Sequence, residues 1–219
     1  WPSELFEVET PTAPIQMSPY DARQIDTMLK AARSSAAERD PDWSALLPGS
    51  YPTNLLTVNG RTALALALAE IAPGKDDEIL VVTTTGSPYI SGCVTREIEK
   101  LCHWARKPSP ATRAVLVIHE FGYPAALPAG LDPKLPVIED CAWAFGVDRP
   151  DLQVGARGDF VIYSLPKALP MPFGGLLRAK RPLARAGNAP LLSDAALRMV
   201  RAGVQLHGAE IAAAVRARL

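Results

Sequence analysis

Short runs of apolar residues recur through the middle of the chain, and each ends at a turn or gives way to a helical pattern. The runs are continuous rather than alternating, which is typical of strands that are covered on both faces of a sheet. This pattern predicts strands at residues 55–58, 78–83, 114–119, 135–140, 159–164 and 175–179.

Helical patterns lie between and beside these strands. They predict helices over residues 21–39, 61–71 ("RTALALALAEI"), 90–105 and 190–219. Strands that alternate with helices indicate an α/β fold, here a three-layer α/β/α sandwich with a mostly parallel sheet. About a dozen residues without a helical pattern join the last two strands, so one of the two is expected to run antiparallel.

The same pattern divides the chain into three parts. Residues 1–54 are expected to form an N-terminal arm and helix, with a loop over 40–54. Residues 55–180 form the large α/β domain, and residues 181–219 form a C-terminal helical segment.

Composition and charge narrow the function classes. The 219 residues suit one domain with a real core, since 48% are hydrophobic. Lys+Arg and Asp+Glu are both 23, which argues against nucleic acid or an anionic membrane as the main partner. The sequence shows no membrane-spanning run and no signal-peptide pattern, and it begins at Trp1, so a trimmed N-terminus is expected.

The cysteines indicate a compartment. Cys93, Cys102 and Cys141 are odd in number and irregularly spaced, which favours reduced thiols in a cytoplasmic protein over a disulfide framework. No Cys/His cluster has the spacing of a metal site, so no metal is expected.

Candidate chemistry gathers where predicted strands end, since ligands of open α/β sheets bind beyond the carboxyl ends of the strands. In "VNGRTAL", a strand runs into Asn59-Gly60 and a helix begins near Thr62. The free N–H groups of such a turn and the helix dipole favour an anion. A plain turn with a helix cap explains the same residues equally well.

Three further side chains stand at such ends. Asp140, after "VIE", is either paired with a cation or a helix cap. His119 in "VIHEFGYP" either faces a ligand or bonds to a neighbouring loop. Lys167 lies among three prolines in "YSLPKALPMPFGG"; it is either a desolvated amine able to form a Schiff base or a lysine at the edge of the core.

The order of these elements adds a resemblance. A glycine turn into a helix, "H.FG.P", "IEDCA", "VG..GD..I.S", a lysine and "GG" follow one another from about Leu55 to Ala179. This order is similar to that of the DegT/DnrJ family of pyridoxal-phosphate (PLP) enzymes, the sugar aminotransferases with the aspartate-aminotransferase fold. The spacing from Asp140 to Lys167 (167 − 140 = 27) also fits that family.

The resemblance implies a PLP-binding large domain over 55–180 and assigns a role to each candidate. Lys167 would form the Schiff base and move protons as a catalytic residue. Asp140 would pair with the pyridinium nitrogen, and His119 would lie near the active site as a third catalytic residue. The remaining residues implied to bind the cofactor are Gly60, Arg61 and Thr62 of the phosphate turn, Ser164 at the phosphate, Trp143, and Tyr89 as the aromatic nearest the ring.

The resemblance also implies a PLP-dependent aminotransferase that acts on a small-molecule amino donor and a keto acceptor, sugars included, and that forms a homodimer. The chain departs from the family pattern at three places: Arg61 replaces a Thr, Trp143 replaces a Gln or His, and Ser164 precedes Lys167 by three residues instead of five. It is also expected to be a short form without the family's C-terminal small domain.

Two alternatives to an active aminotransferase stay open. The departures fit a catalytically degenerate PLP-fold protein with an interaction or regulatory role. A PLP lyase or desulfurase would need a cysteine on an exposed segment, and the sequence gives no clear sign of one.

Overall fold

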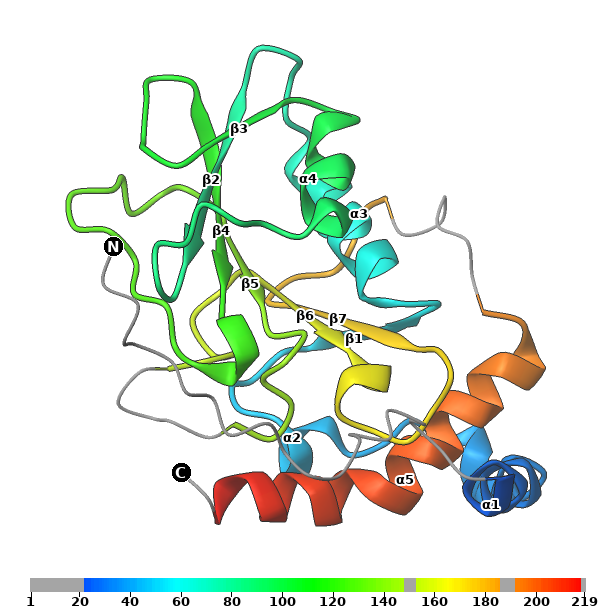
Figure 1. The fold of residues 1–219 in the computed structure, drawn as a ribbon. Helices are drawn as coiled ribbons and strands as arrows, with labels where there is room; N and C mark the ends of the chain where they lie inside the picture. The colour runs from blue at the N-terminus through cyan, green and yellow to red at the C-terminus, as the bar shows by residue number, and fades with distance from the viewer. Residues whose placement is uncertain (1–21, 148–152, 186–191, 218–219) are drawn as a thin grey trace, which may run out of the picture.

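A computed structural model gives the structure of the protein and describes residues 22–147, 153–185 and 192–217. The described chain forms one sheet between layers of helix and loop (Figure 1). The sheet has seven strands in the order β1-β7-β6-β5-β4-β2-β3. The strands are β1 Thr53–Thr57, β2 Glu78–Thr83, β3 His103–Ala105, β4 Thr112–Ile118, β5 Val137–Asp140, β6 Phe160–Ser164 and β7 Gly175–Ala179.

Strand direction places the candidate site at one edge of this sheet. The five neighbouring strands β3, β2, β4, β5 and β6 pair in parallel. Strand β7 pairs antiparallel with both β6 and β1. Strand β1 therefore runs in the same direction as β6. The carboxyl ends of β1, β2, β4, β5 and β6 consequently meet at the same edge. The prediction that one of the last two strands is antiparallel is confirmed.

Four of the five α-helices correspond to predicted helices, and their bounds differ; the helix predicted over 21–39, for example, ends at Ala32. They are α1 Ala22–Ala32, α2 Trp43–Leu46, α3 Gly60–Ile71, α4 Gly92–Glu99 and α5 Asp194–Arg216, with 3-10 turns η1 Ser35–Glu38, η2 Glu120–Gly122 and η3 Leu165–Lys167.

Two predictions of local structure are wrong. The helix predicted over 90–105 ends at Glu99, and the chain continues into edge strand β3. The segment 40–54, predicted as loop, contains the one-turn helix α2, which Asp42 caps by accepting hydrogen bonds from Ser44 N and Ala45 N. In both places a short element depends on packing that a local pattern does not contain.

Each face of the sheet is covered by its own apolar cluster. Helices α3 and α4 lie over one face, where residues such as Leu64, Ile98 and Leu116 pack together. On the other face, α2 and α5 cover β6 and β7, and the loop after β4 covers β2 and β4 through Ala125. The predicted three-layer α/β/α fold with a mostly parallel sheet is confirmed.

The described part of the N-terminal segment packs against the C-terminal helix. Arg198 of α5 donates from Nε to Ala32 O at 2.8 Å and forms an ion pair with Glu38 at 3.0 Å. Arg201, one turn later, pairs with Asp40 at 2.8 Å. These contacts attach α1 and η1 to α5, so two segments far apart in sequence form one layer (Figure 1).

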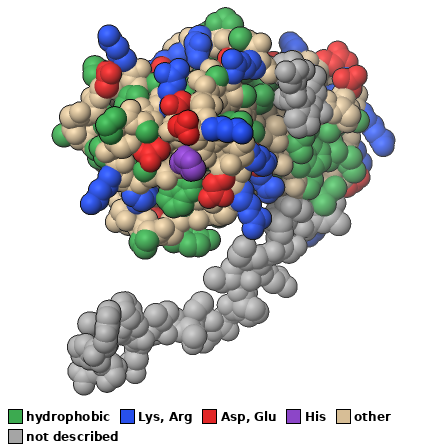
Figure 2. All heavy atoms as spheres, turned by 90° about the horizontal axis from the view of Figure 1, so that it is seen from above, with side chains coloured by type: hydrophobic (Ala, Val, Ile, Leu, Met, Phe, Trp, Pro, Cys, Tyr) green, Lys and Arg blue, Asp and Glu red, His purple; other side chains and the backbone are tan. Residues whose placement is uncertain are grey.

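Charge is mixed over the surface. Figure 2 shows basic and acidic side chains interspersed on the face that it draws, without a broad area of one sign. This agrees with the equal numbers of Lys+Arg and Asp+Glu, 23 each. None of the helices in the described ranges combines the length and the apolar character needed to cross a bilayer.

Candidate active site

A cavity of about 410 Å³ lies at the carboxyl ends of the strands. Five of the strands bring a residue to it, either as their last residue or just beyond their end. These residues are Asn59 after β1, Thr83 of β2, His119 after β4, Asp140 of β5 and Ser164 of β6. The sheet topology therefore gathers candidates that are more than a hundred residues apart in the chain.

The phosphate turn predicted from "VNGRTAL" opens helix α3. Asn59 caps the helix, because its Oδ1 accepts a hydrogen bond from Thr62 N at 2.9 Å. Gly60 packs so closely that an added Cβ would lie 3.1 Å from Ser164 Cβ. Gly60 and Arg61 line the cavity, and Thr62 lies just beyond its lining. Glycine at position 60 thus allows the helix start to touch the residue that precedes η3.

Asp140 lies at the floor of the cavity with 7% of its surface exposed. Its Oδ1 accepts a hydrogen bond from Ala142 N at 2.9 Å. The described residues donate no hydrogen bond to its second oxygen. Burial raises the pKa of Asp140, and the Ala142 N–H together with the nearby Lys167 amine and His119 ring offsets part of that rise. A buried carboxylate with one unused oxygen suits a cationic or N–H partner in the cavity.

Lys167 also lines the cavity but lies at its mouth, in the last position of η3. Its side chain is exposed. The amine sits over the indole of Trp143, with Nζ 4.7 Å from the ring centroid. Trp143, half exposed at 49%, packs in turn against Phe121 with 5.8 Å between ring centroids. The amine therefore contacts a π face, and among the described residues no carboxylate lies within ion-pair distance of it.

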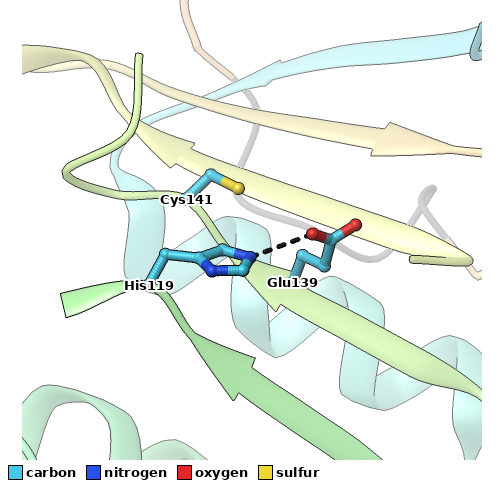
Figure 3. A group of neighbouring side chains, drawn as sticks. All are labelled: His119, Glu139 and Cys141. Carbon is cyan, nitrogen blue, oxygen red and sulfur yellow. Dashed lines mark hydrogen bonds and ion pairs between the residues drawn. The ribbon is translucent and has the colours of Figure 1, made fainter. Parts of the chain in front are cut away.

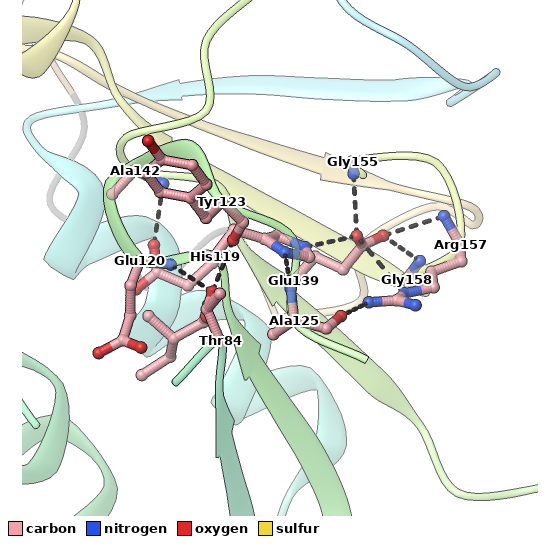
Figure 4. A network of polar contacts seen from close by, with 12 residues as sticks. Thr84, His119, Glu120, Tyr123, Ala125, Glu139, Ala142, Gly155, Arg157 and Gly158 are labelled. Carbon is pink, nitrogen blue, oxygen red and sulfur yellow. Dashed lines mark hydrogen bonds and ion pairs between the residues drawn. The ribbon is translucent and has the colours of Figure 1, made fainter. Parts of the chain in front are cut away.

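His119 is fully engaged within the protein. Its Nδ1 accepts from Ala125 N at 3.1 Å, and its Nε2 lies 2.9 Å from Glu139 Oε2 (Figure 4). Because Nδ1 accepts, Nε2 carries the proton and donates it to Glu139. The ring lines the cavity, yet both nitrogens are bonded to protein groups.

Glu139 is the centre of this network and is completely buried. Besides His119, it accepts backbone N–H bonds from Gly155 at 2.8 Å, Arg157 at 2.9 Å and Gly158 at 2.6 Å (Figure 4). Burial alone would raise the pKa of Glu139, but the hydrogen bonds from His119, Gly158 and Gly155 outweigh it and the pKa is lowered. Neighbouring residues in a strand point to opposite faces, so Glu139 fixes the loop behind the sheet while Asp140 faces the cavity.

His119, Glu139 and Cys141 together resemble a metal site in composition. Their ligand atoms lie within 4.8 Å of one another. Figure 3 shows the three side chains from close by. The hydrogen bonds already made by Glu139 and His119 occupy those atoms, and burial keeps the pKa of the Cys141 thiol well above its ordinary value. A thiol that stays protonated is a poor metal ligand, so this cluster acts as a hydrogen-bonded support of the sheet.

Exposed aromatic side chains surround the mouth of the cavity. Tyr89 and Phe121 are each 76% exposed, and both line it together with Trp143. The segments that carry the first two are tied together, because Glu120 Oε2 accepts from Thr85 N and Thr85 Oγ1, both at 2.9 Å. Tyr89, which the resemblance implies to be the aromatic residue nearest the cofactor ring, thus lies at the mouth of the cavity and away from the floor of the cavity.

Cys93 is a cavity residue that was not predicted from the sequence. It is exposed in the first turn of α4, lines the cavity, and its Sγ lies 3.7 Å from Arg61 Nη2. From the sequence, no cysteine is expected on a clearly exposed loop; Cys93 is exposed, but it lies in a helix. Cys102 and Cys141 are buried. Phe121 was also overlooked, although an aromatic in "HEFGYP" directly after a strand end was an available signal.

The architecture places the chain in a structural class, that of the aminotransferase fold. It is similar to the X-ray structure of the aminotransferase from Psychrobacter cryohalolentis, with 15% identity and a TM-score of 0.60 over 85% of this chain and 62% of that chain. It is also similar to AtS13 from Actinomadura melliaura (20% identity, TM-score 0.57, 85% of this chain and 65% of that one). A third structure is ntda from Bacillus subtilis with bound cofactor PMP (12% identity, TM-score 0.53, 84% and 54%).

A family model matches a part of the chain. The model of the DegT/DnrJ/EryC1/StrS aminotransferase family matches residues 103–177, which include His119, Asp140, Ser164 and Lys167. The resemblance to this family predicted from the motifs is thereby confirmed for that stretch. The chain spans less than two thirds of the length of the three similar structures. No curated protein matches the chain.

Proposed function

We propose that the protein is a PLP-dependent aminotransferase in which Lys167 forms the covalent C=N linkage to the cofactor. The observation that carries this proposal is a single cavity lined by Asp140, Ser164 and Lys167 together with the Gly60 turn. Three of these residues lie within the stretch that matches the aminotransferase family. The order of strands brings them together even though Ser164 precedes Lys167 by three residues instead of the five usual in the family.

The residues of the cavity fit PLP in chemistry. The second oxygen of Asp140 is available for the protonated ring nitrogen, and burial makes that carboxylate a strong partner for a cation. The hydroxyl of Ser164 and the guanidinium of Arg61 line the cavity near the start of α3, where an anion is favoured. The two ends of the cavity therefore offer an anionic group for the ring and donors for the phosphate.

The residues of this chain then have distinct tasks. When bound, PLP supplies a protonated ring that accepts the electron pair released at the substrate Cα. Asp140 would hold the ring nitrogen in its protonated form. Lys167 would act first as nucleophile through Nζ and later take up and return a proton at that atom. His119, fixed by Glu139 and Ala125, supports the loop that carries Phe121 and exchanges no proton.

A spectroscopic titration tests the covalent role of Lys167. Wild-type protein mixed with PLP should gain an absorbance band at the edge of the visible range, and Lys167→Ala should lose it. Lys134→Ala, which removes an exposed lysine of the loop before β5, is the matched control for adducts at surface lysines and should keep the band. The absence of a band from the wild type, or its persistence in Lys167→Ala, would contradict the proposal.

We further propose that the substrates are a small-molecule amino donor and a keto acceptor, with sugars among the candidates. We propose a homodimer as the working form, because Tyr89, Phe121 and Trp143 expose aromatic surface around the cavity mouth. Light scattering on the purified protein tests the dimer. A cytoplasmic location is supported by the three free cysteines, Cys93, Cys102 and Cys141.

One observation favours a second candidate function, a PLP-fold protein that binds without turnover. Lys167 is exposed against Trp143, and the Thr62 N–H is bonded to Asn59. Such a site could hold the cofactor loosely and serve an interaction or regulatory role. Conversion of the bound cofactor by an amino donor separates the two candidates, since a protein without turnover leaves the cofactor unchanged.

A further inference from the structure

The residue that most distinguishes this cavity is Trp143. It lies three residues after Asp140, between the buried carboxylate and the cavity mouth. Its ring has two neighbours, the Lys167 amine at 4.7 Å from the centroid and the Phe121 ring at 5.8 Å. Trp143 thus follows Asp140 closely in the chain and contacts both Lys167 and Phe121, an aromatic residue of the cavity mouth.

We propose that Trp143 is a positioning residue that holds the Lys167 amine over the cavity through a cation–π contact and so promotes capture of the cofactor aldehyde. This inference rests on the proposed function, since it concerns the same lysine. The proposed role depends on the indole ring of Trp143, which the Gln or His usual at this position of the family would not supply.

The need for such a contact follows from where Lys167 lies. The residue ends η3 and is exposed, so its four-carbon stem is free to turn toward solvent. Lysine loses considerable rotamer entropy when its amine is fixed at one place. Among the described residues no carboxylate forms an ion pair with Lys167, so the indole is the group that holds the amine near the cavity.

The indole is itself held in place. Phe121 packs against its side at an interplanar angle of 41°. Glu120 fixes the turn that carries Phe121 through two hydrogen bonds. Its carboxylate accepts from Thr85 N. Its backbone N–H donates to Thr84 Oγ1 at 3.1 Å (Figure 4). An indole that is held in place by Phe121 can fix a flexible amine more effectively than an aromatic side chain without such a neighbour.

The chemical step that benefits is the addition of the amine to an aldehyde. The ammonium held by the indole first gives one proton to solvent. The Nζ lone pair then attacks the carbonyl carbon, a C=N bond forms, and the carbonyl oxygen leaves as water with the two remaining protons of the amine. No oxidant or reductant takes part. A residue that keeps Nζ within the cavity raises the rate of this encounter without touching the reacting carbon.

The test measures capture of PLP by the full chain, apart from any turnover. Stopped-flow absorbance follows formation of the linkage, and borohydride trapping with peptide mass spectrometry reports the share at Lys167. Trp143→Leu should slow capture at Lys167 about fivefold, the worth of an exposed cation–π contact. Trp143→Phe, which keeps a ring, should retain most of the wild-type rate.

Tyr123→Leu is the matched control. Tyr123 is another exposed aromatic beside the cavity mouth, at 68% exposure, and it does not line the cavity. The Tyr123→Leu variant should capture PLP at Lys167 at the wild-type rate. Circular dichroism spectra of all three variants should match the wild-type spectrum, which keeps a loss of folding apart from a loss of positioning.

The outcomes separate the inference from the function on which it rests. If the wild type captures PLP at Lys167 and Trp143→Leu captures it equally fast or faster, the positioning role is refuted and the proposed function stands. If Trp143→Phe is as slow as Trp143→Leu, the π face is not the cause. If the wild type captures no PLP at Lys167, the proposed function itself fails.

Discussion

At the scale of single residues, Asp140 is the side chain on which the candidate site depends most. It is a carboxylate at a strand end with 7% exposure, one backbone hydrogen bond and a pKa raised by burial. A charge in this position destabilises the protein when the cavity holds no partner. In the proposed function, the same charge would balance a protonated ring nitrogen of the cofactor. Asp140 would then lower stability in the cofactor-free protein and favour binding of the cofactor.

This effect on stability can be measured through pH. Because the folded pKa of Asp140 is raised, its carboxyl favours folding below the ordinary value of 3.8, and this contribution is lost as pH rises through the folded pKa. Asp140→Asn should therefore raise the melting temperature of cofactor-free protein at pH 7, and the gain should shrink as pH falls toward 3.8. Thermal melts across pH measure it. A variant that melts below the wild type at pH 7 would show that the carboxylate is not strained.

The same variant should hold PLP more weakly than the wild type, because the amide cannot balance a positive ring nitrogen. Equilibrium dialysis with PLP measures the loss. Stability and affinity should thus move in opposite directions, which a general folding defect would not produce.

Residue types at strand ends were visible in the sequence, whereas their contacts were not. Asp140, Ser164 and Lys167 were predicted to lie at one site, and they do line one cavity. The stacking of Lys167 on Trp143 and the bond of His119 to Glu139 depend on residues twenty or more positions away. No local pattern contains such distances, so the environment of each side chain had to come from the structure.

At the scale of elements, Glu139 joins strands β4 and β5 to the segment 155–158. It accepts a hydrogen bond from His119 at the end of β4 and three backbone N–H bonds from that segment. A carboxylate is needed here because every partner donates. The amide of glutamine would turn a donor toward at least one of these N–H groups.

Glu139→Gln should consequently lower the free energy of unfolding by about 1–3 kcal/mol, the cost of a buried unsatisfied donor. Glu210→Gln, an exposed position on α5 without a hydrogen bond to its side chain among those described, is the control and should change stability by less than about 0.5 kcal/mol. Chemical denaturation of both variants gives the comparison. Equal stability of Glu139→Gln and the wild type would mean that the network does not hold the site together.

The elements themselves were largely predictable, with errors where packing decides. The strands β2, β4, β5, β6 and β7 coincide with apolar runs, and α3 follows the "NG" turn as expected. Strand β3 was missed because its three residues pair only with β2 at the sheet edge and carry no apolar run of their own. The turn η3 was hidden by the prolines around Lys167, which also suit extended backbone.

At the scale of the whole molecule, one sheet gathers the functional groups at one edge and the helices support it from both faces. The cavity is lined by residues from Asn59 to Lys167, so the site draws on a stretch of more than a hundred residues. The face drawn in Figure 2 mixes charges of both signs, which suits a small-molecule ligand better than a charged polymer. The chain covers 62% of the aminotransferase from Psychrobacter cryohalolentis, and the proposed activity concerns the residues that it does share with that fold.

The most direct test of the account is the half-reaction with an amino donor. Protein loaded with PLP is mixed with a panel of amino acids, and absorbance follows the bound cofactor. The account predicts that at least one donor converts it to the pyridoxamine form in the wild type, and that Lys167→Ala carries out no such conversion. A wild-type band at Lys167 that persists with every donor would contradict an aminotransferase and favour a protein that binds without turnover.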